Sequence, residues 1–173
     1  MINQNIESIT ENILNKLSIN SHNDIDIVKI ANFLSVDVKS ENLDTDISGL
    51  FVIKGDNAYI RYNDNEIEAR QRFTIAHELG HFILHKNSKP LFVDKSEKVM
   101  YRNFDSSTGE IKKEREANAF AASLLMPKKF ILLAINNIPS YEVDTISYLA
   151  KEFKVSEQAM NFRLANLGLI SLY

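Results

Sequence analysis

The sequence predicts an α+β fold in which a small antiparallel β-sheet packs on a helix with the motif His-Glu-x-x-His, followed by a helical C-terminal segment. The sheet is predicted by a hairpin pattern, Ser48–Ile53 and Ala58–Tyr62, whose β-branched and aromatic residues flank the turn residues Gly55-Asp56-Asn57. Residues 72–85 carry apolar side chains at helical spacing. Two further helical patterns fill residues 145–168.

Other elements are expected on both sides of the hairpin. Residues 3–18 and 25–35 have helical periodicity, and residues 110–126 form an alanine-rich helical pattern. Residues 86–110 are the least regular part and include Pro90, so we expect a loop there. A hairpin strand beside the motif helix is a candidate for holding a peptide backbone as an added strand.

Length and composition favour one compact domain over residues 1–173, since 45% of the residues are hydrophobic and 25% are charged. The absence of cysteine argues against a disulfide-stabilised secreted protein. We expect a cytoplasmic protein without a membrane segment, because the N-terminus lacks the regions of a signal peptide and no apolar run approaches the ~20 residues that span a bilayer. The net charge of −3 gives no global attraction to nucleic acid.

The run Arg72–His85 contains the most informative pattern, the His-Glu-x-x-His motif of zinc-dependent peptidases. His77 and His81 lie one turn apart on one helix face, so two imidazoles can bind one zinc ion. Glu78 can lean over the same face and act as the catalytic base that moves a proton from the attacking water to the leaving nitrogen. A chance match is disfavoured, because this helix is apolar around most of its circumference and burying three polar groups without partners is costly.

Zinc needs a third protein ligand, and cysteine is excluded because the chain has none. A metzincin would place a histidine six residues after His81, where this chain has Asn87. The alanine-rich helix at residues 110–126 can pack closely on the motif helix and present a carboxylate instead.

Within that helix we favour Glu114 as the third ligand. Asn118 lies one turn further along and can hydrogen-bond the other ring nitrogen of a ligand histidine, which would hold its orientation. Glu116 remains the alternative ligand. We expect its side chain to face solvent as a partner of Lys112 or Lys113.

The motif run and the segment Glu114-x-Glu-Ala-Asn118-x-Phe-Ala-Ala-x-Leu-Leu-Met-Pro127 together resemble the ImmA/IrrE family of bacterial and phage-associated metallopeptidases. Their order and the intervening residues 101–109 also fit, so the resemblance covers about residues 25 to 170. The resemblance implies a zincin-like fold, zinc ligands His77, His81 and Glu114, and the base Glu78. It also implies that the substrate is a helix-turn-helix repressor of a phage or mobile element, whose cleavage derepresses phage, mobile-element or stress genes.

Peptide hydrolysis also needs a hydrogen-bond donor for the developing negative oxygen. Tyr101 and Arg102 are the candidate oxyanion stabilisers, and their spacing does not select between them.

The segment 141–173 has the pattern of a helix-turn-helix subregion, with Ser156 as the N-cap of a second helix that Gly168 ends. This pattern supports an alternative function, a DNA-binding or repressor-binding transcriptional regulator. The segment carries three Lys/Arg against four Asp/Glu, so we expect no direct DNA binding and favour a structural or protein-docking role. A pseudoenzyme that only binds a repressor is a third alternative, which the intact Glu78 disfavours.

Overall fold

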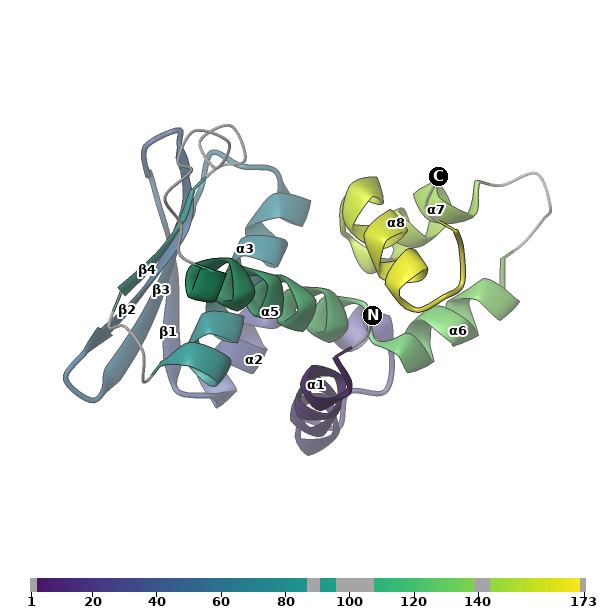
Figure 1. Cartoon of the computed structure of the whole chain (residues 1–173), viewed down its shortest axis with the longest axis horizontal. Coiled ribbons are helices and arrows are strands. Elements are labelled where there is room, and N and C mark those ends of the chain that lie inside the picture. The colour runs from purple at the N-terminus through teal and green to yellow at the C-terminus, as the bar shows by residue number, and fades with distance from the viewer. Residues whose placement is uncertain (1–2, 87–90, 96–107, 139–143, 172–173) are drawn as a thin grey trace. The chain divides into compact units, whose positions relative to one another are not determined.

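The computed structural model describes residues 3–86, 91–95, 108–138 and 144–171. The chain divides into two compact units, one of residues 26–121 and one of residues 1–25 with 122–173. Figure 1 shows the sheet of the first unit and the helices of the second. Each unit is described separately below.

The described residues combine helices with a sheet, and three of the strands follow one another directly along the chain, so the predicted α+β class is confirmed. The elements are α1 Gln4–Lys16, η1 His22–Asp24, α2 Ile27–Phe33, β1 Val36–Glu41, β2 Ile47–Lys54, β3 Asn57–Asn63, α3 Glu68–His85, β4 Leu91–Lys95, α5 Thr108–Leu125, α6 Lys128–Asn136, α7 Thr145–Phe153 and α8 Glu157–Asn166. The helices predicted near residues 3–18, 25–35, 72–85 and 110–126 are confirmed as α1, α2, α3 and α5.

The sheet has the strand order β1-β3-β2-β4. β2 and β3 form the predicted antiparallel hairpin, and β4 pairs antiparallel with β2. The prediction of a purely antiparallel sheet is wrong, because β1 pairs parallel with β3. The chain reverses between β1 and β2 and again between β2 and β3, so β1 and β3 run in the same direction when they become neighbours.

Two further expectations about this sheet are wrong. Neither hairpin strand has a free edge to receive a peptide, because β2 lies between β3 and β4, and β3 lies between β1 and β2. The region 86–110 is not only a loop, since it contains β4 and the start of α5. A short apolar run such as Leu91-Phe-Val can pair as a strand when a neighbouring strand supplies the hydrogen bonds.

The motif helix α3 packs on the sheet and positions the candidate site. Its apolar residues Ile75 and Leu79 are buried together with Phe51 of β2 and Ile60 of β3. The ring of Phe51 also lies 5.6 Å from that of Phe82, centroid to centroid. Burying such side chains contributes about 1.5–3 kcal/mol each, which holds α3 in place on the sheet.

The helical unit contains α1, α6, α7 and α8, and apolar side chains of all four helices are buried. Ser156 caps α8 by accepting a hydrogen bond from the Ala159 N–H, as the sequence predicted. Arg163 of α8 is buried and donates to both carboxylate oxygens of Glu7, at 2.5 and 2.9 Å. The Thr10 and Ser123 hydroxyls hydrogen-bond each other at 2.6 Å.

Within the described ranges no single helix is long and apolar enough to cross a membrane, and only the bent pair Gly109–Leu125 with Lys128–Asn136 would fit by length and composition.

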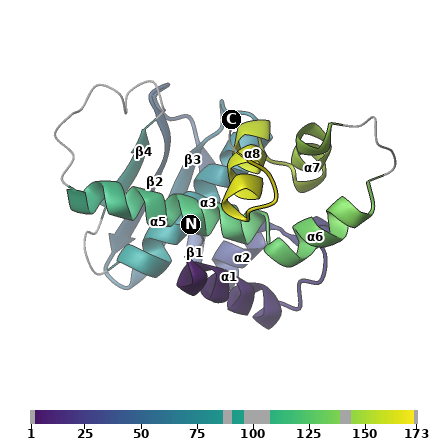
Figure 2. The same cartoon turned by 45° about the vertical axis from the view of Figure 1, so that its right-hand side comes forward.

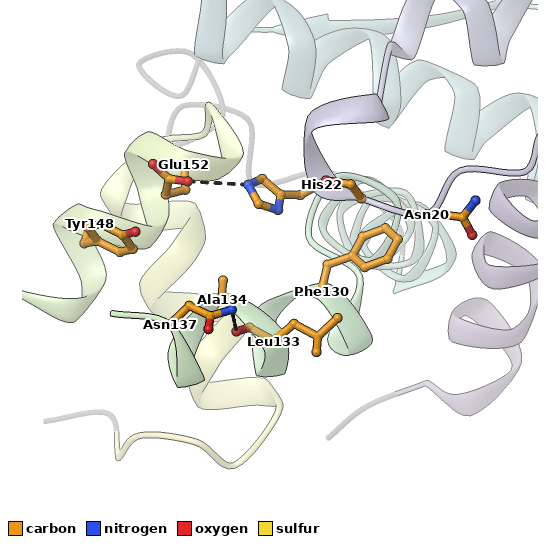
Figure 3. Close-up of a pocket in the computed structure, with 9 residues that line it drawn as sticks. Asn20, His22, Phe130, Leu133, Ala134, Asn137, Tyr148 and Glu152 are labelled. Atoms are coloured by element: carbon orange, nitrogen blue, oxygen red, sulfur yellow. Dashed lines mark hydrogen bonds and ion pairs between the residues drawn. The ribbon is translucent and has the colours of Figure 1, made fainter. Parts of the chain in front are cut away.

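A pocket of about 230 Å³ opens in the helical unit among residues of η1, α6 and α7 (Figure 3). At its wall, His22 Nε2 lies 3.5 Å from a Glu152 oxygen, and the His22 ring stacks on Phe153 with centroids 4.6 Å apart. None of the residues that the sequence singled out as catalytic or metal-binding lines it. We assign no role in catalysis to this pocket.

Candidate metal centre

The candidate site lies where α5 packs against α3, and the two helices cross in Figures 1 and 2. A Cβ atom on Gly80 would lie 3.1 Å from Ala117 Cα and 3.2 Å from Ala117 O, so the two backbones approach about as closely as they can. Glycine on α3 and alanine on α5 permit this approach, because larger side chains would separate the helices. The long polar side chains beside this contact therefore reach from one helix to the other.

Three ligand-type side chains converge at this contact. One ligand atom each from His77, His81 and Glu114 lies within 4.8 Å of the others, and these residues form a group that could hold a metal ion. The two Nε2 atoms of the histidines are 3.0 Å apart. The Glu114 oxygens lie 3.2 Å from His77 Nε2 and 3.3 Å from His81 Nε2.

These separations fit a single ion with tetrahedral coordination. Ligand atoms bound at about 2.0–2.1 Å in tetrahedral geometry are about 3.3–3.4 Å apart along each edge. The 3.0 Å between the two Nε2 atoms, the 3.2 Å from His77 Nε2 to Glu114 Oε2 and the 3.3 Å from His81 Nε2 to Glu114 Oε1 are all close to that edge length, so either carboxylate oxygen lies near a ligand position. The donor set of two imidazoles and one carboxylate leaves a fourth position for water or substrate, as catalytic sites require.

Asn118 holds the first histidine in the orientation that a metal ligand needs. Asn118 Oδ1 lies 2.9 Å from His77 Nδ1. Because an amide oxygen only accepts hydrogen bonds, Nδ1 carries the proton and Nε2 keeps its lone pair. That lone pair faces the other two members of the group.

The charge states of the group also suit a cation. Burial lowers the pKa of His81 below its usual value, so this imidazole is neutral at pH 7 and retains a lone pair. Burial alone would raise the pKa of Glu114, but the adjacent imidazoles of His77 and His81 outweigh that effect and hold its pKa well below the ordinary value. Glu114 is therefore an ionised carboxylate that faces a neutral His81.

Glu78 is fully buried on α3 and lies next to β2. A Cβ atom on Gly49 would lie 3.8 Å from Glu78 Cγ and would clash with the methyl group of Thr74. The glycine in β2 thus gives the α3 side chains room at this position. A carboxyl group excluded from bulk water is in the kind of environment in which proton transfer can be tuned.

The structure changes the interpretation of Glu116 and draws attention to His85, to which the sequence assigned no role. The expectation that Glu116 faces solvent with a lysine as its partner is incomplete. One of its oxygens lies 3.8 Å from Lys112 Nζ, but the other lies 3.0 Å from His85 Nε2. His85 Nδ1 in turn lies 3.2 Å from His81 Nδ1. The i, i+4 spacing of His81 and His85 was the available signal for this contact.

The candidate oxyanion stabilisers Tyr101 and Arg102 lie outside the described residues. Their role stays a prediction.

Residues 31–165 match the family described as the IrrE N-terminal-like domain, Peptidase_M78. The chain belongs to this family. The resemblance inferred from the motif residues is therefore confirmed, and the chain is a member of a metallopeptidase family.

Two relatives carry informative names. The chain is 33% identical over 99 residues to "Uncharacterized immunity region protein 2" of Bacillus phage phi105, which covers 57% of each protein. It is 27% identical over 139 residues to "Metallopeptidase ImmA" of Bacillus subtilis strain 168, which covers 73% of this chain and 75% of that protein.

A solved structure named "Mycobacterium tuberculosis transcriptional regulator" has a similar fold. Its TM-score is 0.64 at 17% identity, over 95% of this chain and 47% of that chain. This likeness shows a shared fold only. The chain spans about half the length of this structure and of the phage relative, at 47% and 57%.

Proposed function

We propose that this protein is a zinc-dependent endopeptidase in which His77, His81 and Glu114 bind the metal. The observation that carries the proposal is the convergence of two imidazole nitrogens and one carboxylate at separations of 3.0–3.3 Å. Membership of the Peptidase_M78 family supports the same activity. Zinc is the ion that best suits a tetrahedral site of nitrogen and oxygen donors with an open fourth position.

A divalent ion bound there would act as a Lewis acid that polarises the peptide carbonyl and makes water more acidic. Glu78 is the proposed catalytic base: its carboxylate takes a proton from the attacking water and passes it to the leaving nitrogen. Asn118 is a positioning residue, since it acts on the site by orienting His77. Tyr101 or Arg102 is the proposed donor to the oxyanion.

We propose a helix-turn-helix repressor of a phage or mobile element as the substrate, cleaved in the cytoplasm to derepress the genes that it controls. The name of the phage relative, an immunity region protein, supports a substrate of this kind. In this proposal residues 1–173 act together as one metallopeptidase domain, with 141–173 as a docking subregion.

The decisive experiment incubates the purified chain with a candidate helix-turn-helix repressor, chosen from the genes that neighbour its own. We expect a discrete pair of fragments that a chelator prevents. Glu78→Gln should keep its zinc, because the ligands are intact, but hydrolysis should fall by about 10² or more. Glu11→Gln, an exposed change on α1, is the matched control and should cleave normally.

The metal itself is tested by elemental analysis of the purified protein. His77→Ala should lose stoichiometric zinc, because two remaining ligands rarely hold such an ion. A full zinc complement in that variant would exclude the proposed ligand set. Normal cleavage by Glu78→Gln would exclude Glu78 as the base.

A regulator that binds DNA through α7 and α8 is the alternative function, and the helix pair with its Ser156 cap is the feature in its favour. The charges of this pair argue against it. Arg163 is buried in its ion pair with Glu7, so it is not available to a phosphate. Only Lys151 and Lys154 remain as basic residues of the segment 141–173, beside four acidic ones.

Duplex DNA retention at physiological salt separates the two functions. We expect no salt-sensitive binding, because few counterions can be released by so few cations. Tight binding to an operator, combined with an uncleaved repressor, would establish the regulator instead.

A further inference from the structure

The pocket of the helical unit (Figure 3) is formed by α6, α7 and residues 20–22, and none of its lining residues belongs to the proposed metal site. Its volume of about 230 Å³ is below the ~300–1,000 Å³ of pockets that hold a drug-sized molecule. The pocket is reached from solvent, because Leu133 at its wall is 52% exposed. Its size and access suit a single side chain of a binding partner.

One wall of the pocket is apolar and comes from α6. Phe130 is buried in this wall, and Leu133 and Ala134 follow it by three and four residues, so the three lie on one face of the helix. Tyr148 of α7 adds an aromatic ring. Such a wall favours the hydrocarbon part of a ligand over water.

The polar side chains of the pocket differ in whether they already have a partner. Asn20, Ser21 and Asn137 each hydrogen-bond a backbone group close to them in the sequence. The Tyr148 hydroxyl makes no hydrogen bond with a described residue. Glu152 has a contact to its Oε2 atom only. The groups that remain for a ligand are therefore the phenol and the carboxylate.

Glu152 gives the pocket an acidic end. It is the only carboxylate among the described lining residues, and no lysine or arginine is among them. His22 Nε2 lies 3.5 Å from Glu152 Oε2, which is too long for a strong hydrogen bond, and the His22 ring stacks on Phe153. Within the described part of the chain, Glu152 has no ion pair with a lysine or arginine. Its carboxylate is thus available to a cation.

We propose that this pocket binds an arginine or lysine side chain of the protein substrate. The hydrocarbon stem of such a side chain suits the apolar wall at Phe130 and Leu133. Its cationic group suits Glu152 and the neighbouring ring of Tyr148, which are four residues apart on one face of α7. An apolar side chain would leave the carboxylate without a partner, and an acidic side chain would be repelled by it.

The choice of partner rests on the proposed function. A repressor that binds DNA must carry lysine and arginine side chains to neutralise phosphates, so a helix-turn-helix substrate presents the chemistry that the pocket accepts. The segment 141–173, which supplies Tyr148 and Glu152, has four acidic residues against three basic ones. This sign of charge favours encounter with a basic partner surface.

Binding is measured by NMR titration of the full chain with a blocked arginine, Nα-acetyl-arginine N-methylamide. The matched probe is its citrulline analogue, which has nearly the same shape without the charge. We expect the arginine probe to shift the amide signals of Leu133, Tyr148 and Glu152. The citrulline probe should bind about fivefold more weakly, which is typical of losing a partly exposed ion pair. Equal affinity for the two probes, or no saturable shift at the pocket, would overturn the proposal.

Two variants locate the binding site. Glu152→Gln keeps the size of the side chain without its charge, so it should bind the arginine probe about as weakly as the wild type binds citrulline. Ala134→Leu should weaken both probes, because the added side chain fills the pocket while Glu152 stays in place. Glu11→Gln, an exposed change on α1 outside the pocket, is the control and should bind as the wild type does. Wild-type affinity in Glu152→Gln would overturn the proposal.

Cleavage kinetics with the candidate repressor supply the second readout. Glu152→Gln should raise KM about fivefold and leave kcat unchanged, because a docking contact away from the scissile bond is made equally in the ground and transition states. An unchanged KM would show that the substrate does not use the pocket and would overturn the proposal.

A purely structural role of the contact between His22 and Glu152 would give a different pattern. Glu152→Gln would then lower the free energy of unfolding, while the folded variant bound the arginine probe and the substrate normally. That result would overturn the docking site but leave the proposed metal site intact. If the wild type cleaves no helix-turn-helix repressor, the proposed function fails, and the arginine titration still decides whether the pocket binds a basic side chain.

Discussion

The contact between Gly80 and Ala117 makes a quantitative prediction about the assembly of the metal centre. In Gly80→Ala the new methyl group would lie 3.1 Å from Ala117 Cα, 3.2 Å from Ala117 O and 3.2 Å from Phe120 Cβ. Two of these atoms belong to the α5 backbone, so no side-chain rotation can relieve the contact. The helices must therefore separate by a few tenths of an ångström.

The energetic cost combines two opposing effects. Overpacking a buried contact costs about 1–3 kcal/mol, whereas replacing glycine by alanine inside a helix stabilises it by about 1 kcal/mol. We expect Gly80→Ala to lower the free energy of unfolding by about 1 kcal/mol. Gly80→Val should lower it by about 3 kcal/mol, because a β-branched residue adds volume with less gain in helix propensity.

The same separation should weaken metal binding. Glu114 and Asn118 flank Ala117 on α5, and both must reach the histidines of α3 within about 0.5 Å of their best positions. We expect zinc affinity to fall about tenfold in Gly80→Ala. Urea unfolding of the zinc-free protein and chelator competition measure the two effects. A Gly80→Ala protein that is more stable by about 1 kcal/mol and binds zinc normally would refute the reasoning.

Two other predictions concern stability. Glu7→Ala should cost about 3 kcal/mol in urea unfolding, because it leaves the buried Arg163 guanidinium without its carboxylate. Adding Arg163→Met should restore part of the loss, and an equal cost in the double variant would contradict the pairing. Asp26→Ala removes the N-cap of α2 and should cost about 1 kcal/mol at pH 7. Burial raises the pKa of Asp26, but hydrogen bonds from the Lys29 and Val28 N–H groups and the Lys29 charge lower it overall. The stabilisation by this cap is therefore fully present above pH 3.8 and is lost as the pH falls through the folded-state pKa. If the urea midpoints of the wild type and Asp26→Ala differ by the same amount at pH 2 and pH 7, the cap does not depend on an ionised Asp26.

The elements that could be predicted from the sequence are those that short-range periodicity determines. His77 and His81 are four residues apart on one helix, so their convergence needs no other part of the fold. Ser156 caps α8 through an N–H three residues later, and the β2–β3 hairpin closes through adjacent turn residues. In each case the interacting groups are held together by the geometry of the local backbone.

The order of the strands was not predictable in the same way. β1 pairs with β3 and β4 pairs with β2, so each outer strand pairs with a strand that is not the nearest strand in the sequence. Such pairing depends on burial of the sheet against α3, which no local pattern encodes. The antiparallel prediction failed at β1 for this reason.

The sequence by itself determined the motif histidines, the glutamate between them, the helical and hairpin segments, and the family to which they belong. Only the tertiary structure decided which carboxylate meets these histidines, because the helices α3 and α5 are brought together by packing across Gly80 and Ala117. Helical phase separated Glu114 from Glu116, but the distance between the helices allows both side chains to reach α3, Glu114 to His77 and His81 and Glu116 to His85. Local periodicity determines the direction in which a side chain points from its own helix. Only the packing of the second helix determines which residues that side chain contacts.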